Sequence, residues 1–230
     1  MHKHNFLLSL ITVMTILASA EAKGERVQGN EGEMPRLVVN ILIDQLRSDY
    51  LETFSPLYVE DGFQQLLRDG CYYRQAVYTV VPRDRAVGTA TLATGTTPAN
   101  HGIVGERFLH RETLRPTVAV EDATVQGRGT TDRFSPASLL VTTLADELKL
   151  ATGGHAYVVS IAPQATMAIL SGGHAADQAV WIDDRNGQWV TSSYYGELPL
   201  WADLRNTRQR IDRRLAAGTW QPLQRNKPTV

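Results

Sequence analysis

The chain has 230 residues, 43% of them hydrophobic, and its 23 basic residues nearly balance its 24 acidic residues. With no basic block in the sequence, nucleic acid and membrane surfaces are poor candidates for a partner. The single cysteine, Cys71, excludes an internal disulfide, and we expect it to be buried in or beside a strand.

The first 22 residues have the pattern of an export signal. A short basic start precedes an apolar run over residues 6–17, and small residues follow at 18–22. This run is too short to span a bilayer. We therefore expect a signal peptide over 1–22, a flexible lead-in over 23–34, and an exported protein, periplasmic or extracellular, without a transmembrane segment after cleavage. The remaining residues, about 200, suffice for one domain.

Residues 37–43 form an apolar run, rich in β-branched residues and interrupted only by Asn40, that ends at Asp44. Such a run predicts a strand buried on both faces, as in the centre of a parallel sheet. Ligands bind beyond the carboxyl ends of such strands, so Asp44 is a candidate ligand-binding residue. Asp is also a favoured first residue of a helix, and that role remains open for Asp44.

Later segments alternate between helical and strand patterns. The predicted helices cover 47–54, 62–69, 86–94 and a segment from Ser135-Pro136 to Gly153-Gly154. The predicted strands cover 71–81, 156–161, 181–183 and 188–191, the last two joined as a hairpin through Asn186-Gly187. Residues 110–133 have weak periodicity and are expected to cross the surface. Alternating strands and helices favour an α/β layered fold.

Two motifs lie at the end of the helix predicted over 86–94 and directly after it. The sequence reads Ala-Thr-Leu-Ala-Thr-Gly at 90–95 and Pro-Ala-Asn-His-Gly-Ile at 98–103. Together with Asp44 and Gly-Gly-His-Ala-Ala-Asp at 172–177, they resemble the alkaline phosphatase superfamily, in its type I phosphodiesterase/nucleotide pyrophosphatase and PafA-like branch. The resemblance runs from about residue 37 to 206. It implies an α/β three-layer sandwich with a mostly parallel central sheet, incomplete here, so that 35–230 is the N-terminal portion of the domain.

The resemblance also implies a site. Members of the family hold two zinc ions beyond the strand ends, and a Thr or Ser at a helix N-terminus attacks phosphorus. Asp44 matches the first metal-ligating Asp. The ligand is expected to be a phosphate ester or another small anion, and a protein partner is possible. The sequence has no histidine after residue 177, so we expect at most a partial zinc site in this chain.

Several positions depart from the family pattern. Arg85 occupies the position of the nucleophile, and a guanidinium stays protonated and cannot attack phosphorus. Thr89 stands where the family commonly has His. Glu106 occupies the position of an Asn that holds phosphoryl oxygens, and Ala162 and Gln164 occupy those of a Lys and an Arg that contact phosphate.

Two interpretations of Arg85 are open at this point. It could hold an anion at the start of its helix, with Arg83 and Arg107 nearby. Alternatively, these arginines could form structural pairs with Asp84 and Glu106. Among other hydroxyls, Thr79, Thr89 and Thr91 are expected to be ordinary strand or helix residues. His101 and His174 are expected to be structural, donating to backbone carbonyls.

The sequence therefore supports two main functional hypotheses. One is an exported, metal-dependent phosphoric ester hydrolase-like protein whose nucleophile position holds Arg85. The other is a non-catalytic relative that serves as an anion-binding or envelope-assembly module. A hydrolase that uses water as its nucleophile is a third possibility. From the site chemistry, we expect weak or no ordinary phosphatase turnover.

Overall fold

The computed structural model describes residues 35–78, 81, 84–208 and 215–219. The predicted signal peptide and lead-in lie outside these residues. The chain divides into two units, residues 1–41 and residues 42–230, and the elements below belong to the second. Among the described residues, no helix is both long and apolar enough to cross a membrane.

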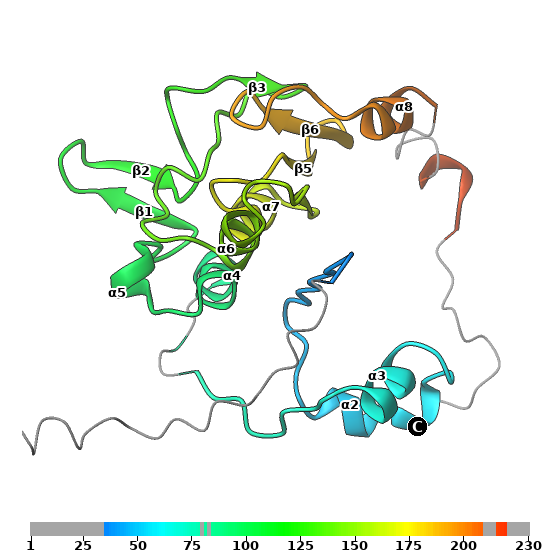
Figure 1. The fold of residues 1–230 in the computed structure, drawn as a ribbon. Helices are drawn as coiled ribbons and strands as arrows, with labels where there is room; N and C mark the ends of the chain where they lie inside the picture. The colour runs from blue at the N-terminus through cyan, green and yellow to red at the C-terminus, as the bar shows by residue number, and fades with distance from the viewer. Residues whose placement is uncertain (1–34, 79–80, 82–83, 209–214, 220–230) are drawn as a thin grey trace, which may run out of the picture. The chain divides into compact units, whose positions relative to one another are not determined.

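A four-stranded sheet forms the centre of the fold (Figure 1). Its order is β3 (Gly127–Arg128), β6 (Gln188–Ser192), β5 (Gln178–Asp183) and β4 (Val159–Ile161). Strands β5 and β6 form an antiparallel hairpin in which Trp181 lies opposite Val190. Asn186 and Gly187 make the turn, and Gly187 has a φ of 66°, which suits glycine. The predicted hairpin is confirmed, and β4 pairs with β5 in parallel.

The helices and a separate hairpin complete the described fold. The helices are α2 (Tyr50–Thr53), the 3₁₀ helix η1 (Ser55–Leu57), α3 (Phe63–Asp69), α4 (Arg85–Thr94), α5 (Pro98–His101), α6 (Leu144–Ala151), α7 (Ala165–Gly172) and α8 (Leu200–Arg208). Strands β1 (Arg107–His110) and β2 (Arg115–Val118) pair antiparallel. Part of the segment 110–133, which was predicted to cross the surface, therefore forms strands. The two strands pair in register from Arg107 opposite Val118 to His110 opposite Arg115.

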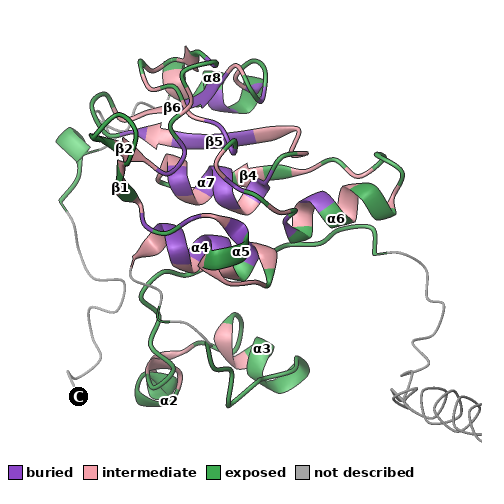
Figure 2. Cartoon of the chain, turned by 90° about the vertical axis from the view of Figure 1, so that its left-hand side faces the viewer, coloured by how far each residue is buried: buried purple, intermediate pink, exposed green. Residues whose placement is uncertain are grey.

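The sheet carries helices on both faces. Helix α7 packs on β4 and β5, and α4 packs on α7 (Figure 2). Successive strand residues point to opposite faces. Val190 lies in the core cluster that also contains Ile169 of α7. Trp189, its neighbour in the strand, therefore faces the other side of the sheet, where its ring makes an edge-to-face contact with Trp201 of α8. The α/β layered architecture expected from the sequence is confirmed.

The core combines small residues of α4 with larger residues of α7 and β5. Ala86 and Ala90 are fully buried one turn apart on α4, and Ile169 and Trp181 are buried against the same cluster. Alanines let the two helices approach closely, since they add no side-chain bulk beyond Cβ. This packing holds the N-terminus of α4 in place.

Helix α4 begins at Arg85, one residue before the predicted start, and ends at Thr94 as predicted. Asp84 is the N-cap, and its Oδ1 accepts a hydrogen bond from the Val87 amide at 3.1 Å. Gly95 follows the helix in the left-handed conformation, with a φ of 67°. Arg85 is consequently the first residue of the helix.

The strand predicted over residues 37–43 is wrong for this structure. These residues form no strand, and Leu37 and Ile41 are more than 70% exposed. A central parallel strand needs hydrogen-bonded neighbours, and none of the described strands pairs with this segment. Asp44 does not begin a helix either: it lies in a turn, and α2 starts only at Tyr50.

Two further predictions fail. Residues 71–78 form no strand, residues 79–80 of that prediction lie outside the described residues, and Cys71 is exposed rather than buried. The segment from Ser135 makes only a single turn, because the Leu140 amide bonds back to the His101 carbonyl at 3.1 Å. The helix that follows, α6, starts after Thr143 with a capping box formed with Asp146.

The strand predicted over 156–161 is confirmed only at its end. Strand β4 covers Val159–Ile161. Its first and last residues, Val159 and Ile161, are exposed, although the pattern predicts burial. β4 is an edge of the described sheet, and its side opposite β5 has no described neighbour to cover it.

Candidate functional site

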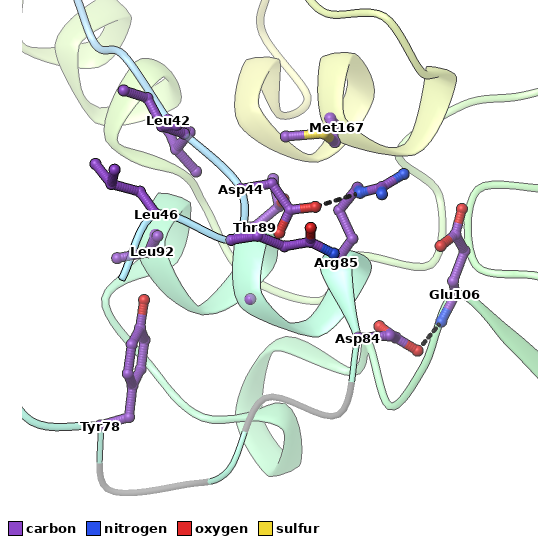
Figure 3. Close-up of a pocket in the computed structure, with 13 residues that line it drawn as sticks. Leu42, Asp44, Leu46, Tyr78, Asp84, Arg85, Thr89, Leu92, Glu106 and Met167 are labelled. Carbon is purple, nitrogen blue, oxygen red and sulfur yellow. Dashed lines mark hydrogen bonds and ion pairs between the residues drawn. The ribbon is translucent and has the colours of Figure 1, made fainter. Parts of the chain in front are cut away.

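Arg85 joins three segments at the N-terminus of α4. Its Nε donates to Oδ2 of Asp44 at 2.7 Å, and its Nη1 donates to Oε1 of Gln164. Gln164 is the N-cap of α7 and lies just beyond the carboxyl end of β4. It contacts the same guanidinium as Asp44. Figure 3 shows the Asp44 carboxylate and the Arg85 guanidinium facing one another.

The electrostatics of the site keep Arg85 charged. The hydrogen bond that Arg85 donates to Asp44, together with the negative charge of Asp44, raises the pKa of the guanidinium above its ordinary value, and the charge of Glu106 adds to this effect. The Arg85 and Asp44 side chains are 29% and 36% exposed, so water screens their attraction. The pair fixes geometry and charge more than it adds stability.

Asp84 positions the loop that carries Glu106. While Oδ1 of Asp84 caps α4, its Oδ2 accepts a hydrogen bond from the Glu106 amide at 2.7 Å (Figure 3). The Asp84 carboxylate is thus bonded to backbone amides. One of the two interpretations from the sequence was a structural pairing of Asp84 with arginine, and no arginine among the described residues pairs with Asp84. Arg83 lies outside the described residues.

These side chains line a cavity of about 530 Å³. Its polar wall contains Asp44, Asp84, Arg85 and Glu106, and Thr89 lies one turn further along α4. Its apolar wall is formed by Leu42, Ile43, Leu46, Leu92 and Met167. A smaller cavity of about 230 Å³ also contains Glu106 in its wall, with Gln164, Asp183 and Arg185. The arrangement suits a ligand with one charged end and one apolar end.

The structure brings together most of the residues singled out from the sequence. Asp44, Arg85 and Gln164 are in direct contact, and Glu106 lies in the wall of both cavities. Ala162 lines neither cavity, since its amide donates to the Val180 carbonyl at 3.1 Å and its side chain packs against the core.

The alternative hydroxyls have different surroundings. Thr89 is buried and lines the larger cavity, and Thr91 hydrogen-bonds with Nε2 of His101 at 3.2 Å. Thr79 lies outside the described residues. Thr89 follows the first turn of α4, where the helix dipole no longer favours an anionic nucleophile as strongly as at the first residue.

The two motif histidines have structural contacts. Nε2 of His174 donates to the Leu139 carbonyl at 3.0 Å, as expected. His101 differs from the expectation, because its Nδ1 accepts from the Ile103 amide at 3.1 Å instead of donating to a carbonyl. Burial lowers the pKa of His101, which keeps the ring neutral.

The described residues do not fit a two-zinc site. Across the part of the chain that the structure describes, no group of three or more His, Cys, Asp and Glu side chains could hold a metal ion. Asp44, the expected ligand, already has a guanidinium on one of its oxygens. A zinc ion there would have to approach a fixed positive charge.

Some functional features were missed from the sequence. The contact between Arg85 and Asp44 has no local signal, because the two residues are far apart in the chain. The pair of the buried Asp183 and the exposed Arg185 was also missed: Arg185 Nη2 lies 2.7 Å from Asp183 Oδ2 and 2.9 Å from Asp132 Oδ2. The pattern Asp-x-Arg at the end of a strand was the available signal.

Comparison with known proteins identifies the family. The family model described as type I phosphodiesterase / nucleotide pyrophosphatase matches residues 38–228, which is most of the chain. The chain belongs to this family. Its alkaline-phosphatase-like α/β fold is likewise supported by a crystal structure of wild-type alkaline phosphatase PafA, with a TM-score of 0.78 and 35% identity over 84% of this chain and 38% of that one.

Three curated relatives match nearly the whole of this chain but less than half of their own length. A protein named calcium-transporting ATPase from Myroides odoratus is 37% identical over 95% of this chain and 40% of its own length. Alkaline phosphatase PhoV from Synechococcus elongatus is 34% identical over 94% and 40%. Alkaline phosphatase PafA from Elizabethkingia meningoseptica is 33% identical over 95% and 39%. The chain thus spans about 40% of the length of these relatives.

A second solved PafA structure bears on the departures from the family pattern. It carries four substitutions, of a threonine, an asparagine, a lysine and an arginine, and has a TM-score of 0.75 to this chain, with 34% identity over 80% of this chain and 36% of that one. These are the residue types expected at positions 85, 106, 162 and 164. The separation of the first two, and of the last two, is the same in both chains.

Proposed function

We propose that the full protein is an exported, phosphoric ester hydrolase-like member of the family that binds a phosphate ester or another small anion and turns it over weakly or not at all. The observation that carries this proposal is Arg85 at the first position of α4, bonded to Asp44. The signal-like pattern of residues 1–22 supports export. The relatives named alkaline phosphatases support a phosphate ester as the ligand class.

The chemistry of Arg85 argues against a covalent route. A nucleophile needs a lone pair, and the guanidinium offers only N–H donors at any physiological pH. Because its contact with Asp44 raises the pKa of Arg85 further, deprotonation is more remote still. No step through a phosphorylated side chain at this position is therefore available.

The same residue suits anion binding. Of the five N–H donors of a guanidinium, the contacts with Asp44 and Gln164 use one each. The remaining donors and the N-terminus of α4 favour a negatively charged group at the mouth of the larger cavity. The apolar wall formed by Leu42, Leu46 and Met167 would then contact the ester group of the ligand.

The test measures turnover and binding in the full-length protein. With an aryl phosphate, we expect the unmodified protein to be at least about a thousandfold slower than PafA measured alongside, the scale on which loss of a nucleophile slows an enzyme. Arg85→Gln should weaken binding of inorganic phosphate at least about tenfold, because it removes charge-assisted hydrogen bonds. Arg68→Gln, which removes a surface partner of Asp69, is the matched control.

Two results would contradict the proposal. Fast turnover by the unmodified protein, with a burst of released aryl alcohol, would show that another group serves as nucleophile. Phosphate binding that is unchanged in Arg85→Gln would remove the anion-binding role. Arg85→Thr separates the missing parts: if it still fails to turn over aryl phosphate, the substitutions at 106, 162 and 164 also limit the reaction.

A further inference from the structure

The contact between Arg85 and Asp44 has a second consequence, which concerns metal binding at the same site. We infer that the Arg85 guanidinium is the resident cation of the Asp44 carboxylate and keeps this carboxylate from binding a divalent metal. The inference goes beyond the proposed function and does not require it, since metal affinity is measured without any phosphate ester. It starts from the misfit between the described residues and a two-zinc site.

The guanidinium occupies Oδ2, one of the two Asp44 oxygens that a metal could use. Its Nε lies 2.7 Å from Oδ2 of Asp44, whereas a zinc ion would bind a carboxylate oxygen at about 2.0–2.2 Å. Both cations cannot hold the same oxygen lone pairs, and two positive charges within a few ångströms repel each other. Binding of zinc to Oδ2 requires that Arg85 move away, and binding to Oδ1 places the zinc ion beside the guanidinium, which repels it.

Gln164 restrains the guanidinium from moving away. Its Oε1 accepts from Nη1 of Arg85, so the planar head is held on two edges by residues from different segments. Gln164 is itself fixed as the N-cap of α7, a helix with a fully buried core face that includes Ile169. Displacement of Arg85 thus breaks two hydrogen bonds, and the partner in one of them, Gln164, begins a helix that packs in the core.

The charges around the cavity determine what would happen without Arg85. The larger cavity contains the carboxylates of Asp44, Asp84 and Glu106 together with the Arg85 guanidinium. Asp84 is already bonded to the Val87 and Glu106 amides, whereas Asp44 is bonded to Arg85 and is 36% exposed. Removal of the guanidinium leaves an anionic cavity with an accessible carboxylate, which favours a divalent cation.

The experiment compares zinc binding among variants of the full-length protein. Zinc affinity and stoichiometry are measured by calorimetry and elemental analysis for the unmodified protein, Arg85→Gln and Arg85→Lys. Gln is neutral and similar in reach, while Lys retains the charge. We expect Arg85→Gln to bind an additional zinc ion, or to bind zinc at least about tenfold more tightly, because the repelling charge is gone. Arg85→Lys and the surface control Arg68→Gln should match the unmodified protein.

Asp44→Asn supplies the complementary test. In the unmodified background it should leave zinc binding unchanged, because Asp44 is held by Arg85. In the Arg85→Gln background it should abolish the gain. The inference is overturned if Asp44→Asn weakens zinc binding with Arg85 present, or if Arg85→Gln folds and gains nothing. Should Arg85→Gln fail to fold, the result for Asp44→Asn alone decides, and neither result depends on phosphate binding.

Discussion

Asp84 and Arg85 are neighbours in the chain, yet their side chains act on different parts of the site. Arg85 reaches across to Asp44 and Gln164, whereas Asp84 accepts from two backbone amides, those of Val87 and Glu106. One residue thereby sets the charge at the start of α4, and the other holds the α4 terminus and the Glu106 loop together.

The double role of Asp84 gives a prediction at the scale of a residue. Asp84→Ala removes a helix cap and leaves a second amide without its acceptor, so we expect the free energy of unfolding to fall by about 1–3 kcal/mol. Asp84→Asn should lose less, because an amide oxygen still accepts. Urea denaturation followed by circular dichroism measures both variants. Asp69→Ala, which removes an exposed partner of Arg68, is the control, and an equal loss there would contradict this account.

At the scale of an element, Gly173 at the end of α7 lies against the residues that begin α6. It has a φ of 71°, and a Cβ at this position would collide with the side chains of Thr143 and Asp146. Those two residues form the buried capping box of α6. Asp146 also accepts from the Ala175 amide at 2.7 Å, so the turn after α7 and the start of α6 share one buried carboxylate.

This arrangement predicts that Gly173→Ala is strongly destabilising. The substitution adds a positive-φ penalty to a collision with buried polar groups, and we expect a loss of more than about 2 kcal/mol in the free energy of unfolding. Gly196→Ala provides the comparison, because Gly196 also has a positive φ, of 86°, but a Cβ there meets nothing within 4 Å. Equal losses for the two variants would show that backbone strain, and not the capping box, dominates.

Elements set by local chemistry were predictable from the sequence. Asp84 and Gly95 bound α4, and Asn186-Gly187 marks the hairpin, because caps and turns involve residues close in the chain. The capping pattern Thr143-x-x-Asp146 was present too, and would have given the true start of α6. Ser135-Pro136 also predicts a helix start, but this signal is not specific, because the same cap and proline residues occur at isolated turns.

The failures share a physical cause. Residues 37–43 and 71–78 have strand-like composition, but a strand forms only when a neighbouring strand pairs with it, and composition does not specify that neighbour. For the site, the family motif pointed to Arg85 and Gln164, which do lie together. The partner of Arg85 was not predicted: the sequence suggested Asp84 and Glu106 as the carboxylates that pair with arginine, whereas the folded geometry brings Asp44 to Arg85.

At the scale of the whole molecule, carboxylates with lowered pKa values also occur outside the wall of the larger cavity. Hydrogen bonds from Arg185 lower the pKa of Asp183 from 3.8 to about 2, and a hydrogen bond from Ser135 lowers that of Asp122. A group whose pKa is lower in the folded state stabilises the fold above its unfolded pKa. That stabilisation is lost as the pH falls through the folded value.

We therefore expect the stability of the full-length protein to decline as the pH falls from about 4 towards 2, the interval spanned by the two states of Asp183. The measurement is the urea midpoint across a pH series at constant ionic strength. Asp183→Asn should flatten the decline while lowering stability at neutral pH. Unchanged pH dependence in that variant would contradict the assignment to the pair of Asp183 and Arg185.

The two contacts of Arg85 also constrain how this site can change over generations. A mutation of Arg85 back to a hydroxyl-bearing residue would leave Asp44 and Glu106 around one cavity without a cation, and Gln164 without its donor. A mutation of Gln164 or Asp44 alone would remove a partner while the guanidinium stays. Each single substitution thus leaves a member of this group without its contact until a second follows, so substitutions at Asp44, Arg85 and Gln164 are expected to have non-additive effects.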